Sequence, residues 1–267
     1  MSKTVDEKTV VGYHVQEGLA VLELNDPPAN TYSYEMMQQL DAAILQARMD
    51  EAVHVIILRG GGEKFFCAGA NIDQLSRMTP VFKYYFCLHA NETLNRLEQT
   101  PKLVIAALNG HCVGGGFEIA LAADLRVAAK GAGKCGLPEV SLGVLPGTGG
   151  TQRLARAVGK SKAIELMAHG KLMTFKEAQA LGLINEIFDR ENFWDAVVKY
   201  ARQFCPPQKA AKAVGRIKRS VVSGLETSFQ EGLALERELQ QQLFESDDAQ
   251  EGLAAFNSKR PAVFTGK

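Results

Sequence analysis

The chain has 267 residues, of which 46% are hydrophobic and 22% are charged, a composition typical of soluble globular proteins. Its 30 basic and 30 acidic residues give a formal net charge of zero, so the overall charge does not favour a nucleic acid or an anionic membrane as a partner. No apolar run approaches the 18 or so residues that a membrane-spanning helix needs.

The length allows one large domain or a domain with an appendage, because single cores stop growing at roughly 250 to 300 residues. The N-terminal residues Met1 to Lys8 contain no apolar signal core and include acidic side chains, so we expect a cytoplasmic protein. The five cysteines are scattered and lack the CxxC spacing of a zinc site, and the five histidines form no cluster. This pattern predicts reduced thiols and no bound metal.

The first half of the chain alternates between strand and helix patterns. An apolar alternation on both sides of Gly18 predicts a hairpin, and Ser33 is positioned to cap an amphipathic helix. Alternation of this kind predicts an α/β domain with parallel strands and crossover helices. The predicted strands are Val10–Gln16, Leu19–Leu24, Val53–Arg59, Leu103–Leu108 and Leu125–Ala128, and the predicted helices are Tyr34–Asp50, Phe82–Leu97 and Glu118–Ala123.

The second half is mainly helical. Thr174 and Glu177 form a capping-box pattern that predicts a helix ending near Leu181-Gly182, followed by a short strand at Leu183–Phe188. Pro206-Pro207 marks a boundary, so we divide the chain into a core of residues 1–205 and a helical region of residues 206–267. Further helices are predicted at Thr151–Val158, Lys162–His169, Lys209–Ser223, Leu225–Phe244 and Asp248–Asn257.

The stretch between the strand Leu103–Leu108 and the following helix carries the first sign of chemistry. It contains three consecutive glycines and then Glu118, three residues after Gly115. Glycine lets a ligand approach the backbone, and the first amides of a helix lack intrahelical partners, so they can receive an oxyanion. Glu118 would lie beside that oxyanion. The alternative is a tight turn whose glutamate only favours the helix N-terminus.

Two further glycine-rich loops favour the chemical interpretation. Glu139 lies in the second, which runs on through Gly147 and opens another helix. The third contains Ala68 and Ala70 directly after the strand Val53–Arg59 and its following turn. Two amides around a carbonyl oxygen stabilise an enolate. Two nearby carboxyls titrate jointly, which favours one acid and one base. Together they suit proton transfer or water addition next to a carbonyl, without a cofactor.

The chain resembles the crotonase (enoyl-CoA hydratase/isomerase) family in all three loops, which read FCAGAN, GHCVGGGFEIALAAD and GLPEVSLGVLPGTGGTQRL, and the similarity runs from about residue 10 to the C-terminus. The resemblance implies an α/β fold built as a right-handed ββα spiral, with a C-terminal helical region that makes a homotrimer or a hexamer of two trimers. It implies an acyl-CoA thioester substrate, with coenzyme A entering as part of that substrate.

The resemblance also implies roles for single residues. The amides of Ala70 and Gly115 match the oxyanion hole, and the Gly147 amide matches a position that helps to seat a water. Glu118 and Glu139 match the two carboxylates that hold this water, with Glu118 mainly its base and Glu139 the proton donor to carbon. The CoA-binding positions that match are Lys64, Ala68, Phe256 and Lys259, the last two in many members reaching an adjacent subunit.

Both glutamates are present, which favours hydration of a 2-enoyl-CoA to the 3-hydroxyacyl-CoA. Double-bond isomerisation and thioester hydrolysis are the alternatives within the family, and RNA binding through the basic segment Lys209–Arg219 is the alternative outside enzymes. Asn71 and Asp73 depart from the family pattern of Asp and Lys and so weaken the expected phosphate contacts. The aromatic residues within 82–86 either shape the acyl pocket or belong to the core.

Overall fold

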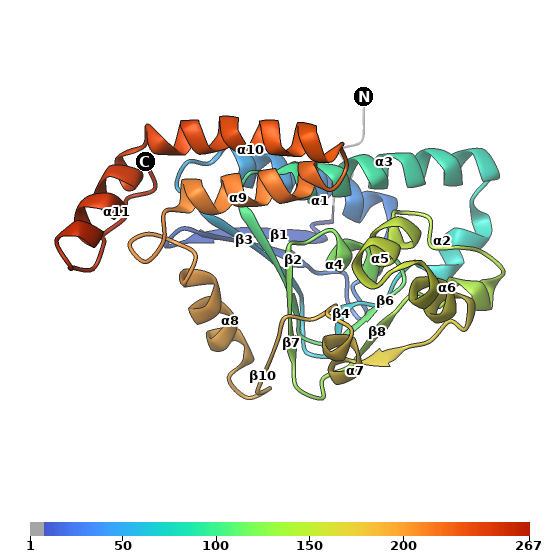
Figure 1. Ribbon diagram of the computed structural model, residues 1–267. Helices are drawn as coiled ribbons and strands as arrows, with labels where there is room; N and C mark the ends of the chain where they lie inside the picture. Colours follow the sequence, from blue (N-terminus) through green and yellow to red (C-terminus); the bar gives the residue numbers. More distant parts are fainter. Residues whose placement is uncertain (1–7) are drawn as a thin grey trace, which may run out of the picture.

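The computed structural model describes residues 8–267, and Figure 1 shows a central sheet with helices around it. The first seven residues, part of the segment behind the prediction of a cytoplasmic protein, lie outside the described residues. The central sheet has six strands in the order β1-β2-β3-β5-β7-β10. They are β1 (Val11–Gln16), β2 (Leu19–Leu24), β3 (Val55–Gly60), β5 (Leu103–Leu108), β7 (Leu125–Ala129) and β10 (Glu186–Phe188).

The predicted hairpin and parallel strands are confirmed. β1 pairs antiparallel with β2, with Val11 opposite Leu24, whereas β2, β3, β5, β7 and β10 pair in parallel along the sheet. Every residue of β5 is buried, as expected of a parallel strand covered on both faces.

A second sheet, which the sequence did not predict, holds the glycine-rich loops. Its four strands run in the order β4-β6-β8-β9, and each is three residues long or shorter. Short runs inside a glycine-rich loop lack the apolar alternation that identifies a strand. Together with the helices that follow them, the strand pairs β3-β4, β5-β6 and β7-β8 give the repeating ββα unit of the crotonase fold. The short strands are β4 (Phe65–Cys67), β6 (His111–Val113), β8 (Lys134–Gly136) and β9 (Met173–Thr174).

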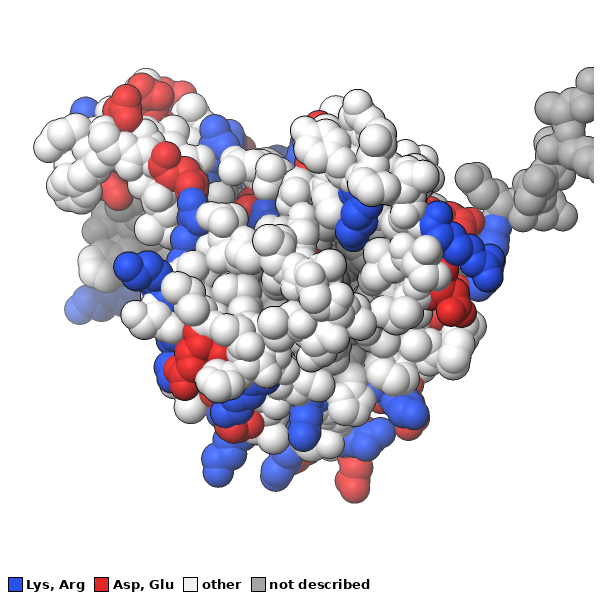
Figure 2. Space-filling view, turned by 90° about the vertical axis from the view of Figure 1, so that its right-hand side faces the viewer, with Lys and Arg blue, Asp and Glu red and all other residues white. Residues whose placement is uncertain are grey.

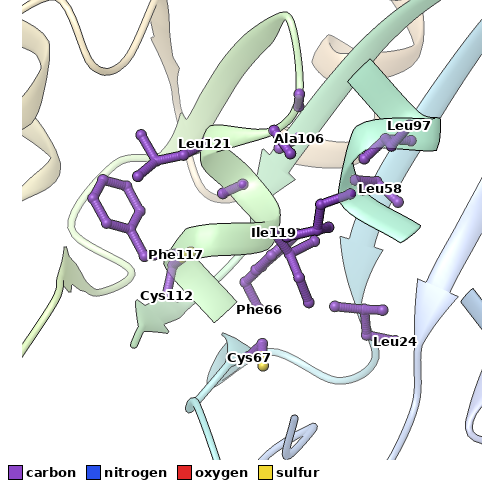
Figure 3. Packing of buried hydrophobic residues seen from close by; sticks show 14 of the residues in the cluster. Leu24, Leu58, Phe66, Cys67, Leu97, Ala106, Cys112, Phe117, Ile119 and Leu121 are labelled. Carbon is purple, nitrogen blue, oxygen red and sulfur yellow. The ribbon is translucent and has the colours of Figure 1, made fainter. Parts of the chain in front are cut away.

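Helix α4 (Gly115–Leu121) lies at the centre of the core, and all seven of its residues are buried. Figure 3 shows Ile119 pointing toward Leu24, Leu58 and Leu97, while Phe117 projects from the opposite side of the helix. The helix begins three residues before the predicted start at Glu118. Gly114, at φ +56°, makes the sharp turn that a side chain would hinder, so the glycines themselves form the first turn.

The other predicted helices of the core are confirmed, and their observed bounds are close to the predicted ones. Ser33 caps the first helix by accepting a hydrogen bond from the Met36 amide at 3.0 Å, and Thr174 and Glu177 form the predicted capping box. The sequence did not predict α2 or α8. The bounds are α1 (Tyr34–Met49), α2 (Ile72–Arg77), α3 (Pro80–Gln99), α5 (Gly150–Val158), α6 (Lys160–Ala168), α7 (Phe175–Ala180) and α8 (Phe193–Arg202).

The C-terminal region consists of α9 (Ala211–Gly224), α10 (Phe229–Phe244) and α11 (Asp247–Asn257). Helix α9 packs on the core, α10 packs on α9, and α11 extends to the far left in Figure 1. Gly215 permits the close approach of α9, because an added Cβ would lie 2.1 Å from the Pro101 carbonyl oxygen. Helix α10 begins four residues after the predicted start, since Ser228 and Glu231 form a capping box there. The division at residue 205 stays a prediction.

A buried ion pair attaches α9 to the core. The Lys218 ammonium lies 2.8 Å from the Asp124 carboxylate, and their side chains are only 3% and 14% exposed. Lys218 also donates to the Leu97 and Lys102 carbonyl oxygens at 3.3 and 3.1 Å, and Asp124 accepts the Val104 amide at 2.7 Å. The basic segment considered for RNA binding therefore has one of its cations inside the protein.

The five cysteines are free thiols, and four of them are buried. Burial raises the pKa of Cys67 and Cys135 to about 12, so these thiols stay protonated at neutral pH. Within residues 8–267, no group of three or more His, Cys, Asp and Glu side chains converges as metal ligands. None of the described helices is both long and apolar enough to span a bilayer.

Candidate active site

The three glycine-rich loops meet at one cleft of about 690 Å³. All five residues predicted to take part in catalysis line it, together with Ala68, one of the predicted CoA contacts. Its outer walls come from α2, the start of α3 and the loop after Glu139. Figure 2 views the side of the molecule where these helices lie, and the centre of that face is largely without charged side chains. The catalytic candidates in the lining are Ala70, Gly115, Glu118, Glu139 and Gly147.

Glu118 is held firmly at the inner end of the cleft. It projects from the first turn of α4 and is only 3% exposed. Its Oε1 atom accepts the amides of Thr148 and Gly150, each at 2.8 Å, and its Oε2 atom accepts the Thr148 hydroxyl. A buried glutamate with three such donors has a fixed orientation.

Glu139 lies in a different environment. It begins a 3₁₀ turn (Glu139–Leu142) that ends at Gly143, whose φ is +71°. No described residue donates a hydrogen bond to its Oε2 atom. Burial raises the pKa of Glu139 to about 7, and the charge of Glu118 adds to this rise. The two carboxyls therefore lie in different environments, because three donors satisfy Glu118 whereas burial favours the protonated form of Glu139.

Two backbone amides in the cleft are available to a ligand. Gly115 is the first residue of α4, so its amide has no partner within the helix. Ala70 follows Gly69, whose φ of +88° and close approach to the Val113 carbonyl exclude a side chain. Among residues 8–267, neither amide is a donor in the backbone hydrogen bonds of turns and loops. A carbonyl oxygen placed between them would meet two donors.

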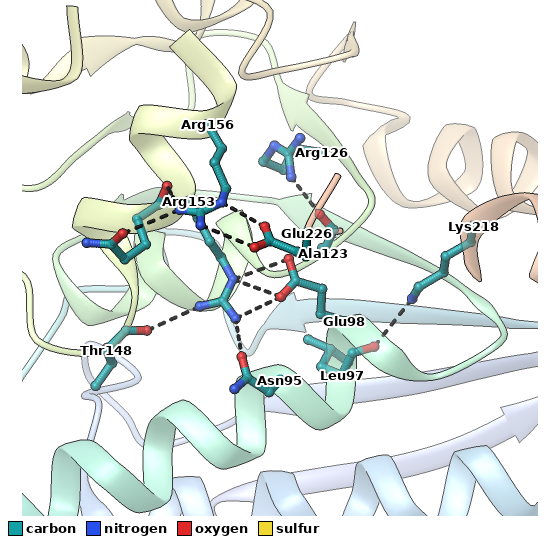
Figure 4. A network of polar contacts seen from close by, with 11 residues as sticks. Asn95, Leu97, Glu98, Ala123, Arg126, Thr148, Arg153, Arg156, Lys218 and Glu226 are labelled. Atoms are coloured by element: carbon teal, nitrogen blue, oxygen red, sulfur yellow. Dashed lines mark hydrogen bonds and ion pairs between the residues drawn. The ribbon is translucent and has the colours of Figure 1, made fainter. Parts of the chain in front are cut away.

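The Thr148 loop is supported from behind by ion pairs. Arg153, on α5, pairs with Glu98 on α3 at 2.9 Å, and its other nitrogen reaches the Thr148 carbonyl at 3.5 Å. Figure 4 shows this guanidinium between Glu98, Asn95 and Thr148. The neighbouring Arg156 joins α5 to Glu226 at 2.7 Å. The donors that hold Glu118 are thereby anchored to α3 and to the C-terminal region.

Three of the four predicted CoA contacts lie outside the cleft lining. Lys64 is exposed and its ammonium lies 5.4 Å from the ring centroid of Phe65. Phe256 and Lys259 lie at the end of α11, and in Figure 1 that helix is on the opposite side of the molecule from α2. Phe256 is 83% exposed. The roles of these three residues stay predictions, as does the phosphate contact that Asn71 and Asp73 put in doubt.

Asn71 has a structural role that its sequence position conceals. Its side chain accepts the Gln74 amide at 3.1 Å and so caps α2. Of the aromatic residues within 82–86, only Phe86 belongs to the core, and the others are exposed. Phe86 is buried and stacks on Tyr32 with ring centroids 5.1 Å apart, whereas Tyr84 and Tyr85 are 66% and 60% exposed. None of the aromatic side chains within residues 82–86 lines the cleft.

Tyr32, Lys83 and Thr148 are among the polar residues of the cleft that the sequence did not identify as part of the site. Thr148 stands between Gly147 and Gly149 in a loop already singled out, so its position beside Gly147 was the available signal. Lys83 lies on α3, and its charge lowers the pKa of Glu139. Tyr32 precedes the first helix and is far from the glycine-rich loops in the sequence, so no local pattern indicated that it belongs to the site.

The cleft combines one fixed carboxylate, one carboxyl that titrates near neutral pH, and two free amide donors. This set can polarise a carbonyl and move a proton to or from the neighbouring carbon. It can also orient a water between the carboxyls.

Comparison with known proteins identifies the family. The family model for enoyl-CoA hydratase/isomerase matches residues 14–267. The chain is 36% identical to the mitochondrial methylglutaconyl-CoA hydratase of Homo sapiens over 99% of this chain and 79% of that protein. It is 35% identical to the crotonyl-CoA hydratase of Syntrophomonas wolfei, over 94% and 96% of the two chains. An enoyl-CoA hydratase structure from Geobacillus kaustophilus superposes with a TM-score of 0.94 at 42% identity, covering 97% and 98%. The protein therefore belongs to the enoyl-CoA hydratase/isomerase family, within the crotonase superfamily.

Proposed function

We propose that this protein is an enoyl-CoA hydratase, which adds water syn across the 2,3 double bond of a 2-enoyl-CoA to give the 3-hydroxyacyl-CoA. The convergence of Glu118 and Glu139 on one cleft carries the proposal. Shifting a double bond requires only proton transfer between carbons, whereas holding a water between two carboxyls is useful for hydration. The names of the hydratases at 35–36% identity support the same reaction class.

The proposed steps use the environments of the two carboxyls. The amides of Ala70 and Gly115 bind the thioester oxygen and stabilise the enolate that develops there. Glu118 accepts a proton from the water as its oxygen attacks C3. Glu139 delivers its proton to C2, and the Gly147 amide helps to seat the water. The proton count balances, because one proton passes to Glu118 and another leaves Glu139.

The rate of hydration should fall as the pH rises through about 7. The pKa of Glu139 is raised to about 7, so its protonated form, the proposed acid, is present below that pH and lost above it. Dehydration starts from the same singly protonated pair, with the proton on Glu118 instead of Glu139, so by microscopic reversibility its kcat/KM should fall over the same pH range. The measurement is kcat/KM in both directions between about pH 5 and pH 9.

A substitution of Lys83 provides the control for this pH profile. Lys83 lowers the pKa of Glu139, so Lys83→Met should move the limb of the hydration profile to higher pH. A profile that is flat across neutral pH, or a limb that moves to lower pH in Lys83→Met, would contradict the assignment of Glu139 as the acid.

The test of the proposed reaction is loss of the conjugated enoyl absorbance when the protein meets crotonyl-CoA, with chromatography of the product. We expect 3-hydroxybutyryl-CoA. Formation of a shifted double bond or of free CoA would instead establish isomerisation or thioester hydrolysis, the alternative reactions. Failure to consume short, long and branched enoyl-CoAs would contradict the proposal.

RNA binding has less support, because Lys218 is buried and Arg219 contacts Gln99 at 2.6 Å.

We also propose that the chain forms a homotrimer or a hexamer. Apolar side chains on and next to α10 and α11 are exposed, including Leu225 and Phe229 at 76% each and Phe256 at 83%. Coverage of these residues by another subunit would stabilise the assembly. It would also offer Phe256 and Lys259 to a neighbouring cleft, where they would contact CoA. Light scattering should give three or six times the chain mass of 29.0 kDa, and a monomer mass would contradict the proposal.

A further inference from the structure

Tyr32 occupies a fixed position over the first turn of α4. Its amide donates to the Gly69 carbonyl at 2.8 Å, and its ring stacks on Phe86 with centroids 5.1 Å apart. The ring packs so closely on Gly115 that an added Cβ there would lie 2.9 Å from the ring carbon Cγ. The side chain is thus held between α3 and the glycine turn from which Glu118 projects.

The hydroxyl group of Tyr32 is buried close to the Thr148 side chain, a hydrogen-bonding neighbour that lowers the pKa of the phenol, but it does not meet Thr148 in hydrogen-bond geometry. Tyr32 is 3% exposed and lines the cleft, yet its oxygen has no hydrogen-bond partner among residues 8–267. Burial raises the pKa of the phenol well above its ordinary value, so it stays protonated and can donate. Buried polar groups normally find a partner, and an unpaired one in a cleft points to a ligand atom.

The neighbours of Tyr32 indicate which ligand atom this is. Thr148 and Glu118 both act on its pKa, so both lie near the ring. The Thr148 hydroxyl already donates to Glu118, and none of the described residues accepts a hydrogen bond from the phenol. The polar atom expected here is the oxygen that Glu118 holds in the proposed reaction.

We propose that the Tyr32 hydroxyl donates a hydrogen bond to the reacting oxygen, which is the water in hydration and the C3 hydroxyl of the product in dehydration. This inference rests on the proposed hydratase function and adds a third polar contact to the two carboxyls. Tyr32 would then orient the water toward C3 and recognise a 3-hydroxyacyl-CoA over the acyl-CoA that lacks the hydroxyl.

Tyr32→Phe tests the contact through binding rather than turnover. By calorimetry, we expect the variant to bind 3-hydroxybutyryl-CoA about threefold to tenfold more weakly than wild type, the range for one neutral hydrogen bond. Binding of butyryl-CoA should stay within about twofold, because it has no oxygen at C3. The kcat for crotonyl-CoA should fall by a similar factor with little change in KM. Tyr84→Phe, an exposed tyrosine on α3, should change none of these values.

Each other outcome overturns the inference. Equal weakening for butyryl-CoA and 3-hydroxybutyryl-CoA would show that Tyr32 only shapes the cleft, and unchanged binding of both would show that no contact exists. Weakening confined to 4-hydroxybutyryl-CoA would move the contact to an oxygen further along the acyl chain. Failure of the proposed function is distinguishable, because wild type would then bind these ligands without hydrating crotonyl-CoA.

Discussion

Replacing either carboxyl of the cleft should reduce the hydration of crotonyl-CoA by about a hundredfold to ten-thousandfold. Glu118→Gln removes the proposed base for the water but keeps an oxygen that can accept the Thr148 and Gly150 amides. Glu139→Gln removes the proposed proton donor, a carboxyl whose pKa burial raises to about 7. Both substitutions preserve side-chain size, so the loss should appear in kcat rather than in folding. The measurement is steady-state kinetics on the purified variants.

The double variant tests whether the two carboxyls act as a unit. If both carboxyls hold the same water, as proposed, Glu118→Gln combined with Glu139→Gln should be little slower than the slower single variant, rather than showing the product of the two losses. Glu92→Gln, at an exposed position on α3, is the matched control and should leave the rate unchanged. Near wild-type activity in either single variant would contradict the two-carboxyl mechanism.

Lys218→Ala should reduce the free energy of unfolding by about 3 to 5 kcal/mol, because it leaves the buried Asp124 carboxylate without its counter-ion. The substitution also removes the donor to the Leu97 and Lys102 carbonyl oxygens. Helix α9 should then detach more easily from the core. Denaturant unfolding followed by circular dichroism measures the effect.

Two further variants distinguish the effect of leaving a buried charge unpaired from the effect of removing any lysine of this helix. Lys212→Ala, at an exposed position of the same helix, should change stability by less than about 0.5 kcal/mol. Adding Asp124→Asn to Lys218→Ala should recover part of the loss, since the amide oxygen can still accept the Val104 amide while the unpaired charge disappears. Equal effects of Lys218→Ala and Lys212→Ala would show that the ion pair contributes little to stability.

Local sequence signals predicted the order of strands and helices and singled out the two glutamates in their glycine-rich loops, whereas the ββα spiral and the proposed roles of Ala70, Gly115 and Gly147 were implied by the family resemblance. The apolar run Leu103–Leu108 can only be buried, and the glycines after it permit a turn that brings Glu118 to the start of a helix. Glu139 and Gly147 stand in a second loop of the same type. Because parallel strands end at one edge of a sheet, the loops that follow them meet, and the structure places all three at one cleft.

Features that depend on contacts between distant segments were not predictable. The short strand His111–Val113 exists because it pairs with β4 and β8, and nothing within its own three residues indicates a strand. Lys218 resembles its basic neighbours in the sequence, yet it enters the core because Asp124 lies there. Tyr32 reaches the cleft because Gly115, more than eighty residues later, leaves room for its ring.

The most direct test of the central claim is the mass spectrum of the product formed from crotonyl-CoA in water enriched in oxygen-18. We predict 3-hydroxybutyryl-CoA with one oxygen-18 atom at C3 and none in the thioester carbonyl, because Glu118 and Glu139 direct a solvent water to that carbon. Label in a free carboxylate would establish thioester hydrolysis. An unlabelled, isomerised acyl-CoA would show that the two glutamates move protons without adding water, and either result would contradict the proposed hydratase.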